Sequence, residues 1–386
     1  MLEKYDEIRP YTDQEAVEAI QRLFRDPEFV RSLSYFEDQL DIDQLVRDAL
    51  DCKSIIEFQK RFSSKIFYYF INKSTTGIHF SGIENVDPTQ PHLYIANHRD
   101  IVLDSSLLQT YLFQNNFPST KSAIGDNLIS GPLFVELARI NNMMLVLRSS
   151  NIHNKIMNLK LLSEYIRHSI VEDKESVWLA QRSGRTKNGY DQTQQGLIKM
   201  VSMAERKNPI PHLKSLNIIP VTISYEYESC DQLKAREWAL SEEGKYVKEP
   251  GEDFKSIVQG VTQFKGEVHM QIGTPISDQL DQIDLSMNIN DQLTKVCQII
   301  DQQIHEHFYL HKNNYIAYDY MEQQGRFQDL YSLEEKNHFM DYLEKQAHIE
   351  EVSYEKMFKN LLLIYSNPVR VKLGEAIPCN IKEEEE

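Results

Sequence analysis

Apolar residues in the middle of the chain occur in short runs of strand length, separated by longer stretches in which apolar residues recur every three or four positions. The short runs are rich in β-branched and aromatic residues, as strands are, and they cover residues 92–96, 142–147, 176–180, 218–225 and 268–272. The longer stretches have the period of helices and cover residues 104–113, 154–170 and 194–204. This alternation predicts an α/β fold with a mostly parallel central sheet flanked by helices on both faces.

The two ends of the chain have helical patterns without such strands. Ile20 and Leu23 share one helix face near the start, and apolar stripes run through residues 293–308 and 357–364 near the end. The Ser-Thr-Thr-Gly sequence of residues 74–77 is a plausible break before the strand-rich part. We therefore expect a helical region over residues 1–76, an α/β domain over residues 77–285 and a helical region over residues 286–386.

Composition narrows the class of protein. The chain has 386 residues and a formal net charge of −16, and an acidic surface repels phosphate backbones, so we expect no nucleic-acid partner. The first residues lack the apolar stretch of a secretory signal, and no uncharged apolar run is long enough to span a membrane. The cysteines lie far apart, as expected for reduced thiols in a cytosolic protein; they are Cys52, Cys230, Cys297 and Cys379.

One stretch departs from the acidic character of the chain. Residues 59–73 contain Lys60, Arg61, Lys65 and Lys73, no acidic residue, and several aromatic rings. Aromatic rings mixed with long cationic side chains are typical of a helix at a membrane surface. A helix packed against the rest of the protein gives the same pattern, so both interpretations stay open.

The first predicted strand of the α/β domain ends at a sequence suited to acid–base chemistry. His98 follows this strand, in the position where ligands bind outside the carboxyl ends of parallel strands. The carboxylate of Asp104 or of Asp100 can accept a hydrogen bond from one ring nitrogen and leave the other nitrogen free to take a proton. A histidine next to aspartates also occurs as a purely structural pair.

Glycines and cations lie near the ends of later predicted strands. They are Gly125, Asn127 and Arg148 around the strand of residues 142–147, and Gly184, Arg185 and Lys187 after the strand of residues 176–180. Backbone N–H groups of such turns and guanidinium groups bind anions. Each group taken singly is also typical of a solvated loop.

The order of these pieces along the chain is characteristic of a known family. The pieces are Asn97-His98 with Asp104, Gly125 to Arg148, Ser183-Gly184-Arg185, and Ile219-Pro220-Val221. In this order they resemble the blocks of the glycerolipid acyltransferase superfamily, the glycerol-3-phosphate and lysophosphatidate acyltransferases, over about residues 77–276. The resemblance implies a glycerol-3-phosphate acyltransferase-like fold with His98 and Asp104 as catalytic residues. It implies substrate-binding roles for Asn97, Gly125, Asn127, Arg148, Gly184, Arg185 and Lys187.

The activity implied by the resemblance is O-acyl transfer in phospholipid synthesis. A fatty acyl group would move from a thioester of acyl-carrier protein or coenzyme A to a hydroxyl of glycerol 3-phosphate, lysophosphatidate or a related polar-lipid precursor. His98 would act as the general base, and the thioester would be a co-substrate, with no other cofactor. A lipid product implies a cytoplasmic protein peripherally associated with the inner face of the membrane. The remaining histidines, including His305, His307 and His311, have no carboxylate partner at ligand spacing, so we expect no metal.

Two departures from the family pattern keep an alternative open. Five residues separate His98 from Asp104 where the family has four, so Asp100 is a rival partner for His98. The glutamate of the third block is missing, with Ser183 or Arg182 in its place. The alternative is a catalytically weakened lipid- or partner-binding protein of the same fold.

Overall fold

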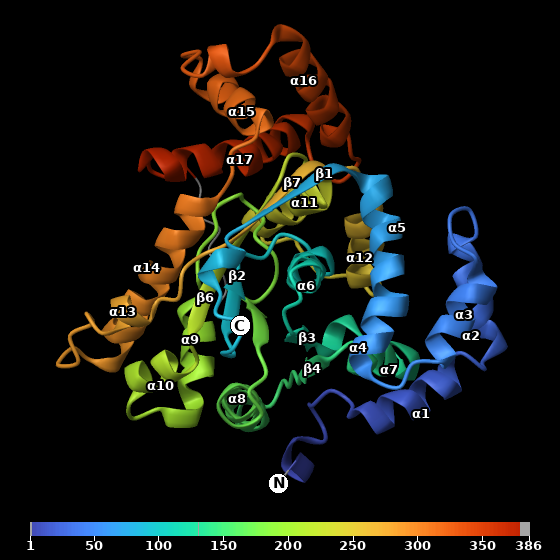
Figure 1. The fold of residues 1–386 in the computed structure, drawn as a ribbon. Helices are drawn as coiled ribbons and strands as arrows, with labels where there is room; N and C mark the ends of the chain where they lie inside the picture. The colour runs from blue at the N-terminus through green and yellow to red at the C-terminus, as the bar shows by residue number, and fades with distance from the viewer. Residues whose placement is uncertain (1, 130, 379–386) are drawn as a thin grey trace.

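The computed structural model describes residues 2–129 and 131–378, and a seven-stranded sheet runs through its centre (Figure 1). The strand order is β1–β7–β6–β2–β5–β3–β4. All neighbours pair in parallel except β6 and β7, which are antiparallel. The strands are β1 (Thr75–Ser81), β2 (Leu93–Ala96), β3 (Lys121–Gly125), β4 (Met143–Val146), β5 (Val177–Ala180), β6 (Ile218–Tyr225) and β7 (Gly266–Ile272). The expected α/β class with a mostly parallel central sheet is confirmed.

Helices cover both faces of the sheet because its strands are apolar on both sides. In β2, Leu93 and Ile95 belong to one apolar core, while Tyr94 and Ala96 belong to the other. The first core is closed by α8 (Ile152–Arg167), α9 (Gln195–Val201), α10 (Pro209–Ser215), α13 (Ser277–Leu280) and α14 (Ile289–His307). The second is closed by α5 (Ser64–Ser74), α6 (Leu103–Gln114) and α12 (Glu252–Thr262).

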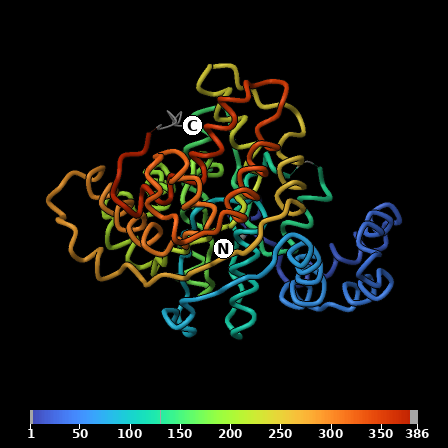
Figure 2. Tube along the Cα trace, turned by 90° about the horizontal axis from the view of Figure 1, so that it is seen from above, coloured from blue at the N-terminus to red at the C-terminus, as the bar shows by residue number. Residues whose placement is uncertain are grey.

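Helical additions flank the sheet on two sides (Figures 1 and 2). The N-terminal helices pack with α7 (Pro132–Ile140) around their own core; they are α1 (Asp13–Leu23), α2 (Pro27–Ser32), α3 (Ile42–Leu50) and α4 (Ile55–Phe58). The C-terminal helices pack with α11 (Asp231–Glu242); they are α15 (Lys312–Glu322), α16 (Leu333–Ala347) and α17 (Tyr354–Leu373). Helix α5 leads directly into β1, and the division at residues 76 and 285 stays a prediction.

The basic and aromatic stretch of residues 59–73 lies within the protein as a π-helical turn, Gln59–Ser63, followed by α5. Its rings at Phe62, Phe67 and Tyr69 are buried. Arg61 and Lys65 form ion pairs with Asp48 at 3.2 and 2.6 Å. These contacts agree with the interpretation of a helix packed against the rest of the protein, and the membrane contact of this stretch stays a prediction.

The sequence also led to expectations about the cysteines and about membrane-spanning helices. Cys52, Cys230 and Cys297 are free thiols and buried, and Cys379 lies outside the described residues. Among the helices of the described ranges, none combines the length and the apolar character needed to cross a membrane.

Candidate active site

His98 lies just after β2, and its ring meets a carboxylate from the first turn of α6. Its Nδ1 lies 3.1 Å from Oδ2 of Asp104. The Asp104 side chain is fully buried, while 13% of the His98 side chain is exposed. A carboxylate that accepts from Nδ1–H fixes the tautomer in which Nε2 is free to accept a proton. The structure thus brings together the two residues that the resemblance names as catalytic.

The loop between His98 and α6 wraps around the Asp104 carboxylate. Oδ2 also accepts hydrogen bonds from the backbone N–H groups of Arg99 (2.7 Å) and Asp100 (2.9 Å). On the other side, the buried Tyr225 hydroxyl of β6 donates to Oδ1 at 2.9 Å. Burial raises the pKa of Asp104, and the bond from His98 opposes that rise. The longer spacing between His98 and Asp104 is accommodated because the intervening backbone donates to the carboxylate.

Asp100, the rival carboxylate, is engaged in starting α6. Its Oδ1 accepts from the backbone N–H groups of Val102 and Leu103, both at 2.8 Å, and its Oδ2 accepts from the Ser229 hydroxyl. Burial pushes the pKa of Asp100 upward, but the buried Lys265 charge and these bonds outweigh burial, so the net shift is downward. The two aspartates therefore have opposite electrostatic surroundings only four residues apart.

A buried ionic network supports the His98 loop from behind. The Arg99 guanidinium pairs with Asp191 at 2.6 Å and with Glu228 at 3.1 Å. Lys234 donates to Glu228 at 2.5 Å and to the Arg99 carbonyl at 2.7 Å. All four charged side chains are buried. This network was not predicted from the sequence. The sequence features that could have indicated it are the arginine beside His98 and the charged residues Glu228 and Lys234 after β6.

Asn97 also belongs to this buried layer. Its amide group donates to the Ile223 carbonyl at 2.9 Å and to Asp191 at 3.0 Å, and its oxygen accepts from the Ile223 backbone N–H at 2.8 Å. The residue is completely buried. The structure therefore places Asn97 between β2 and β6, with these polar atoms engaged inside the protein.

The loop after β5 lies against His98. The backbone N–H of Thr186 donates to the His98 carbonyl at 2.8 Å. Gly184 has φ +72°, a conformation that favours glycine, and a side chain there would meet open space. Lys187 pairs with Glu237. Burial opposes the charge of Arg185, but Cys230 and Asp100 raise the pKa of Arg185 more than burial lowers it.

A second group of predicted substrate residues lies at the ends of β3 and β4, beyond β5 in the sheet. It consists of Gly125, Asn127 and Arg148. A Cβ atom at Gly125 would lie 2.5 Å from Oδ1 of Asn127 and 3.7 Å from Nε of Arg148, so the three residues are close neighbours. Asn127 donates to Asp253 at 3.1 Å. Since β4 is three strands from β2, the two strand ends are about 14 Å apart. The predicted substrate residues thus form two groups along one edge of the sheet.

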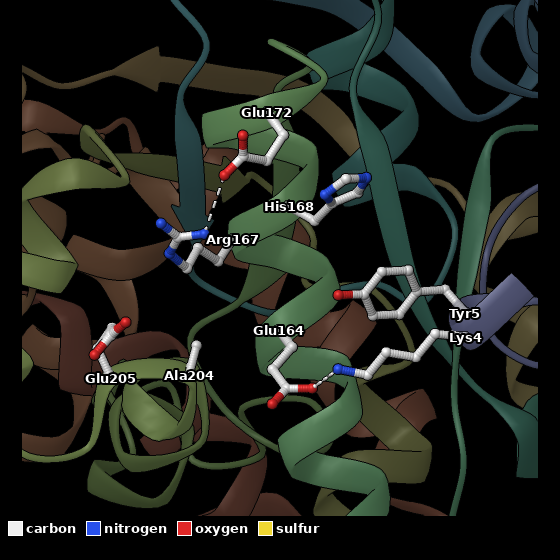
Figure 3. A pocket seen from close by; sticks show the side chains of 8 residues that line it. All are labelled: Lys4, Tyr5, Glu164, Arg167, His168, Glu172, Ala204 and Glu205. Atoms are coloured by element: carbon white, nitrogen blue, oxygen red, sulfur yellow. Dashed lines mark hydrogen bonds and ion pairs between the residues drawn. The ribbon is translucent and has the colours of Figure 1, made fainter. Parts of the chain in front are cut away.

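Figure 3 shows a hollow on the protein surface that His98 does not line. Its volume is about 660 Å³, and Tyr5, Glu164, Arg167 and His168 are among its lining residues. Residues 164–172 directly precede β5, whereas His98 follows β2, which is parallel to β5. The hollow therefore lies toward the opposite edge of the sheet, and its charged groups pair with one another, Lys4 with Glu164 and Arg167 with Glu172.

Comparison with known proteins finds a family match in the central part of the chain. The Acyltransferase family model matches residues 77–224, which confirms the resemblance based on the motifs. No curated protein matches the chain. The 1-acyl-sn-glycerophosphate (LPA) acyltransferase PlsC of Thermotoga maritima is similar at 12% identity and a TM-score of 0.37, covering 77% of this chain and 98% of its own. The signal recognition particle receptor FtsY of Elizabethkingia anophelis is similar at 11% identity and a TM-score of 0.23, covering 76% and 93%.

Proposed function

We propose that this chain moves a fatty acyl group from a thioester to a hydroxyl of a glycerol phosphate-type acceptor, on the support of the Acyltransferase family model that matches residues 77–224. The acceptor is glycerol 3-phosphate, lysophosphatidate or a related polar-lipid precursor, and the reaction belongs to phospholipid synthesis. The observation that supports this most is the His98–Asp104 pair at the carboxyl end of β2, with Nδ1 and Oδ2 3.1 Å apart.

In the proposed mechanism, His98 acts as the general base. Nε2 takes the proton of the acceptor hydroxyl as its oxygen attacks the thioester carbonyl carbon. The resulting imidazolium lies against the buried Asp104 carboxylate, which stabilises its charge. When the tetrahedral intermediate collapses, the thiolate leaves and takes the proton from Nε2. Free thiol and ester are the products, and no residue of the chain is acylated.

We propose that the loop after β5 binds the anionic part of the acceptor. Arg185 can offer two parallel N–H donors to phosphate oxygens, as guanidinium groups do. Lys187 already holds Glu237, so an acceptor phosphate would have to compete with this carboxylate. Arg148, with Gly125 and Asn127, lies further along the same edge of the sheet and is proposed to contact the other end of the bound substrates.

The donor is proposed to be the thioester of acyl-carrier protein or of coenzyme A. We also propose that the chain works in the cytoplasm, peripherally on the inner face of the membrane. The rings of Phe134 in α7 and Phe254 in α12 support a membrane contact near this edge of the sheet. They are 42% and 56% exposed, and their centroids are 6.3 Å apart. Exposed paired rings insert readily into an interface.

An acyl-transfer assay on the full chain tests the proposed function. Each donor, acyl-carrier protein or coenzyme A thioester, is combined with glycerol 3-phosphate, lysophosphatidate and neutral hydroxyl acceptors, and the lipid product is identified. We expect transfer to a phosphate-bearing acceptor by the native chain and none by His98→Ala. Absence of transfer with every pair, together with retained binding to lysophosphatidate, would instead identify a lipid-binding protein of the same fold.

A further inference from the structure

A second cluster of chemically active side chains lies on β1 and β7, the two strands at one end of the sheet, whereas His98 follows β2 in the middle of the sheet. His79 on β1 and His269 on β7 are direct partners in the parallel pairing of the two strands. Their rings stack with centroids 4.4 Å apart. Glu267 precedes His269 by two positions on β7, so all three side chains project from the same face of the sheet. β1 and β7 run side by side near α17 in Figure 1.

The three ligand atoms are close to the spacing of a metal site. Nε2 of His79 lies 3.8 Å from Oε1 of Glu267, and Nε2 of His269 lies 3.9 Å from Oε2 of the same carboxylate. All three candidate ligand atoms lie within 4.8 Å of one another. Ligands bound tetrahedrally at about 2.0–2.1 Å are about 3.4 Å apart. Small side-chain rotations would therefore bring them to bonding geometry.

His269 provides an independent reason to look for a ligand. Within the part of the chain that the structure describes, its Nε2 is buried and has no hydrogen-bond partner. A buried polar atom left unsatisfied is costly, and a metal ion would satisfy it.

We propose that His79, Glu267 and His269 bind a divalent transition-metal ion, with Zn²⁺ as the best fit. Two imidazoles and one carboxylate suit zinc, and three protein ligands leave one position for water. His311 is nearby, with its ring 5.3 Å from that of His269. It precedes α15, where its backbone N–H donates to the Asn314 side chain, and it is not assigned as a ligand. Tyr309 stacks on His269 at 3.6 Å and covers one side of the cluster.

The bound ion would tie the edge strand β1 to β7. β1 lies at the end of the sheet order, and α5 leads into it from the N-terminal region. A metal bridge between the two strands adds to their backbone pairing where β1 has one neighbouring strand. The proposed role is thus to hold β1 against β7, and it is independent of the acyl-transfer proposal.

The test is Zn²⁺ binding by the chelator-treated full chain, measured by calorimetry. We expect one ion per chain and a rise in melting temperature with added Zn²⁺. His79→Ala and Glu267→Gln change exposed side chains, so both variants should fold. Each should weaken binding by more than about 100-fold, the upper end of the effect of a merely supporting residue. His153→Ala removes an exposed histidine of α8 and should bind as the native chain does.

The absorption spectrum of bound Co²⁺ distinguishes binding at this site from binding to the cysteine thiols of the chain. A Co²⁺ complex of the native chain should show ligand-field bands without the charge-transfer absorption of thiolate ligands. The proposal is overturned if the native chain does not bind Zn²⁺, or if folded His79→Ala and Glu267→Gln bind it with native affinity. Circular dichroism of each variant establishes that it is folded. Neither result depends on whether the chain transfers acyl groups.

Discussion

Asparagine substitutions at Asp104 and Asp100 should separate a carboxylate that serves chemistry from one that serves the fold. In Asp104→Asn, the side-chain oxygen can keep the bonds from His98 and from the Arg99 and Asp100 amides, while the new NH₂ group faces the Tyr225 hydroxyl, which can turn to accept. The shape of the site is retained. The negative charge beside the imidazolium is lost.

The magnitudes follow from the two environments. Each bond to Asp104 loses about 1 kcal/mol when its acceptor becomes neutral, but the cost of burying a charge disappears, so we expect stability within about 2 kcal/mol of the native chain. The same change in a Ser-His-Asp triad lowers kcat by about 10⁴-fold, and we expect a loss of at least about 10²-fold here. Asp100→Asn leaves the buried Lys265 without its compensating charge and should cost about 1–3 kcal/mol, with activity within about tenfold.

Acyl-transfer kinetics and denaturant unfolding, run on the same preparations, measure both quantities. The pH dependence of stability gives a further test, because the direction of its change is predicted. Because the pKa of Asp100 is lowered by folding, its ionisation stabilises the native state above the ordinary value of about 3.9, and this contribution is lost as the pH falls. The stability gap between the native chain and Asp100→Asn should therefore narrow toward low pH. If Asp100→Asn is the more damaging change to activity, the assignment of Asp104 is wrong.

Three further outcomes are expected. His98→Ala should lower kcat/KM by about 10²–10⁴-fold with an unchanged melting temperature, and near-native turnover by the folded variant would refute the base role. Arg185→Lys, compared with Arg148→Lys, should raise KM for the acceptor more than for the donor, because lysine keeps the charge but loses the two-donor fork; a defect confined to the donor would assign the loop to the carrier instead. Tyr225→Phe should destabilise the chain by about 1.5–3 kcal/mol and move the acidic limb of the kcat/KM–pH profile upward, because a carboxylate with one donor fewer holds a proton more readily. An unshifted profile would make Tyr225 a structural residue alone.

The sequence was most informative where the local pattern and the tertiary environment agree. β2, β5 and β6 are mostly apolar and almost entirely buried, so composition alone indicates them. β3 and β1 were not predicted. β3 begins with Lys121 and ends with Gly125, and β1 is a half-exposed edge strand whose polar residues face solvent. The antiparallel direction of β7 has no sequence signal, because direction depends on the path of the connecting chain.

The site shows the same division between local and long-range information. The position of His98 after a strand follows from the sequence around it. The residues that hold its loop do not, because Asp191, Glu228 and Lys234 come from distant segments and approach Arg99 only in the folded chain. The choice between Asp100 and Asp104 needed the backbone geometry of the loop, in which Asp100 accepts from the start of α6 and Asp104 accepts from His98.

The place of β7 in the sheet has a consequence for how the chain reaches this structure during synthesis. β1 is made early, but its neighbour in the sheet order is β7, which emerges from the ribosome only after the whole family-matched segment. Until then β1 has no strand to pair with, and β6 presents an open edge. Contacts so distant in sequence form late and slowly. A fragment ending at residue 224 would keep His98 and Asp104, but without β7 both β1 and β6 would permanently lack a neighbouring strand. Expression of the matched segment alone should therefore give aggregated protein.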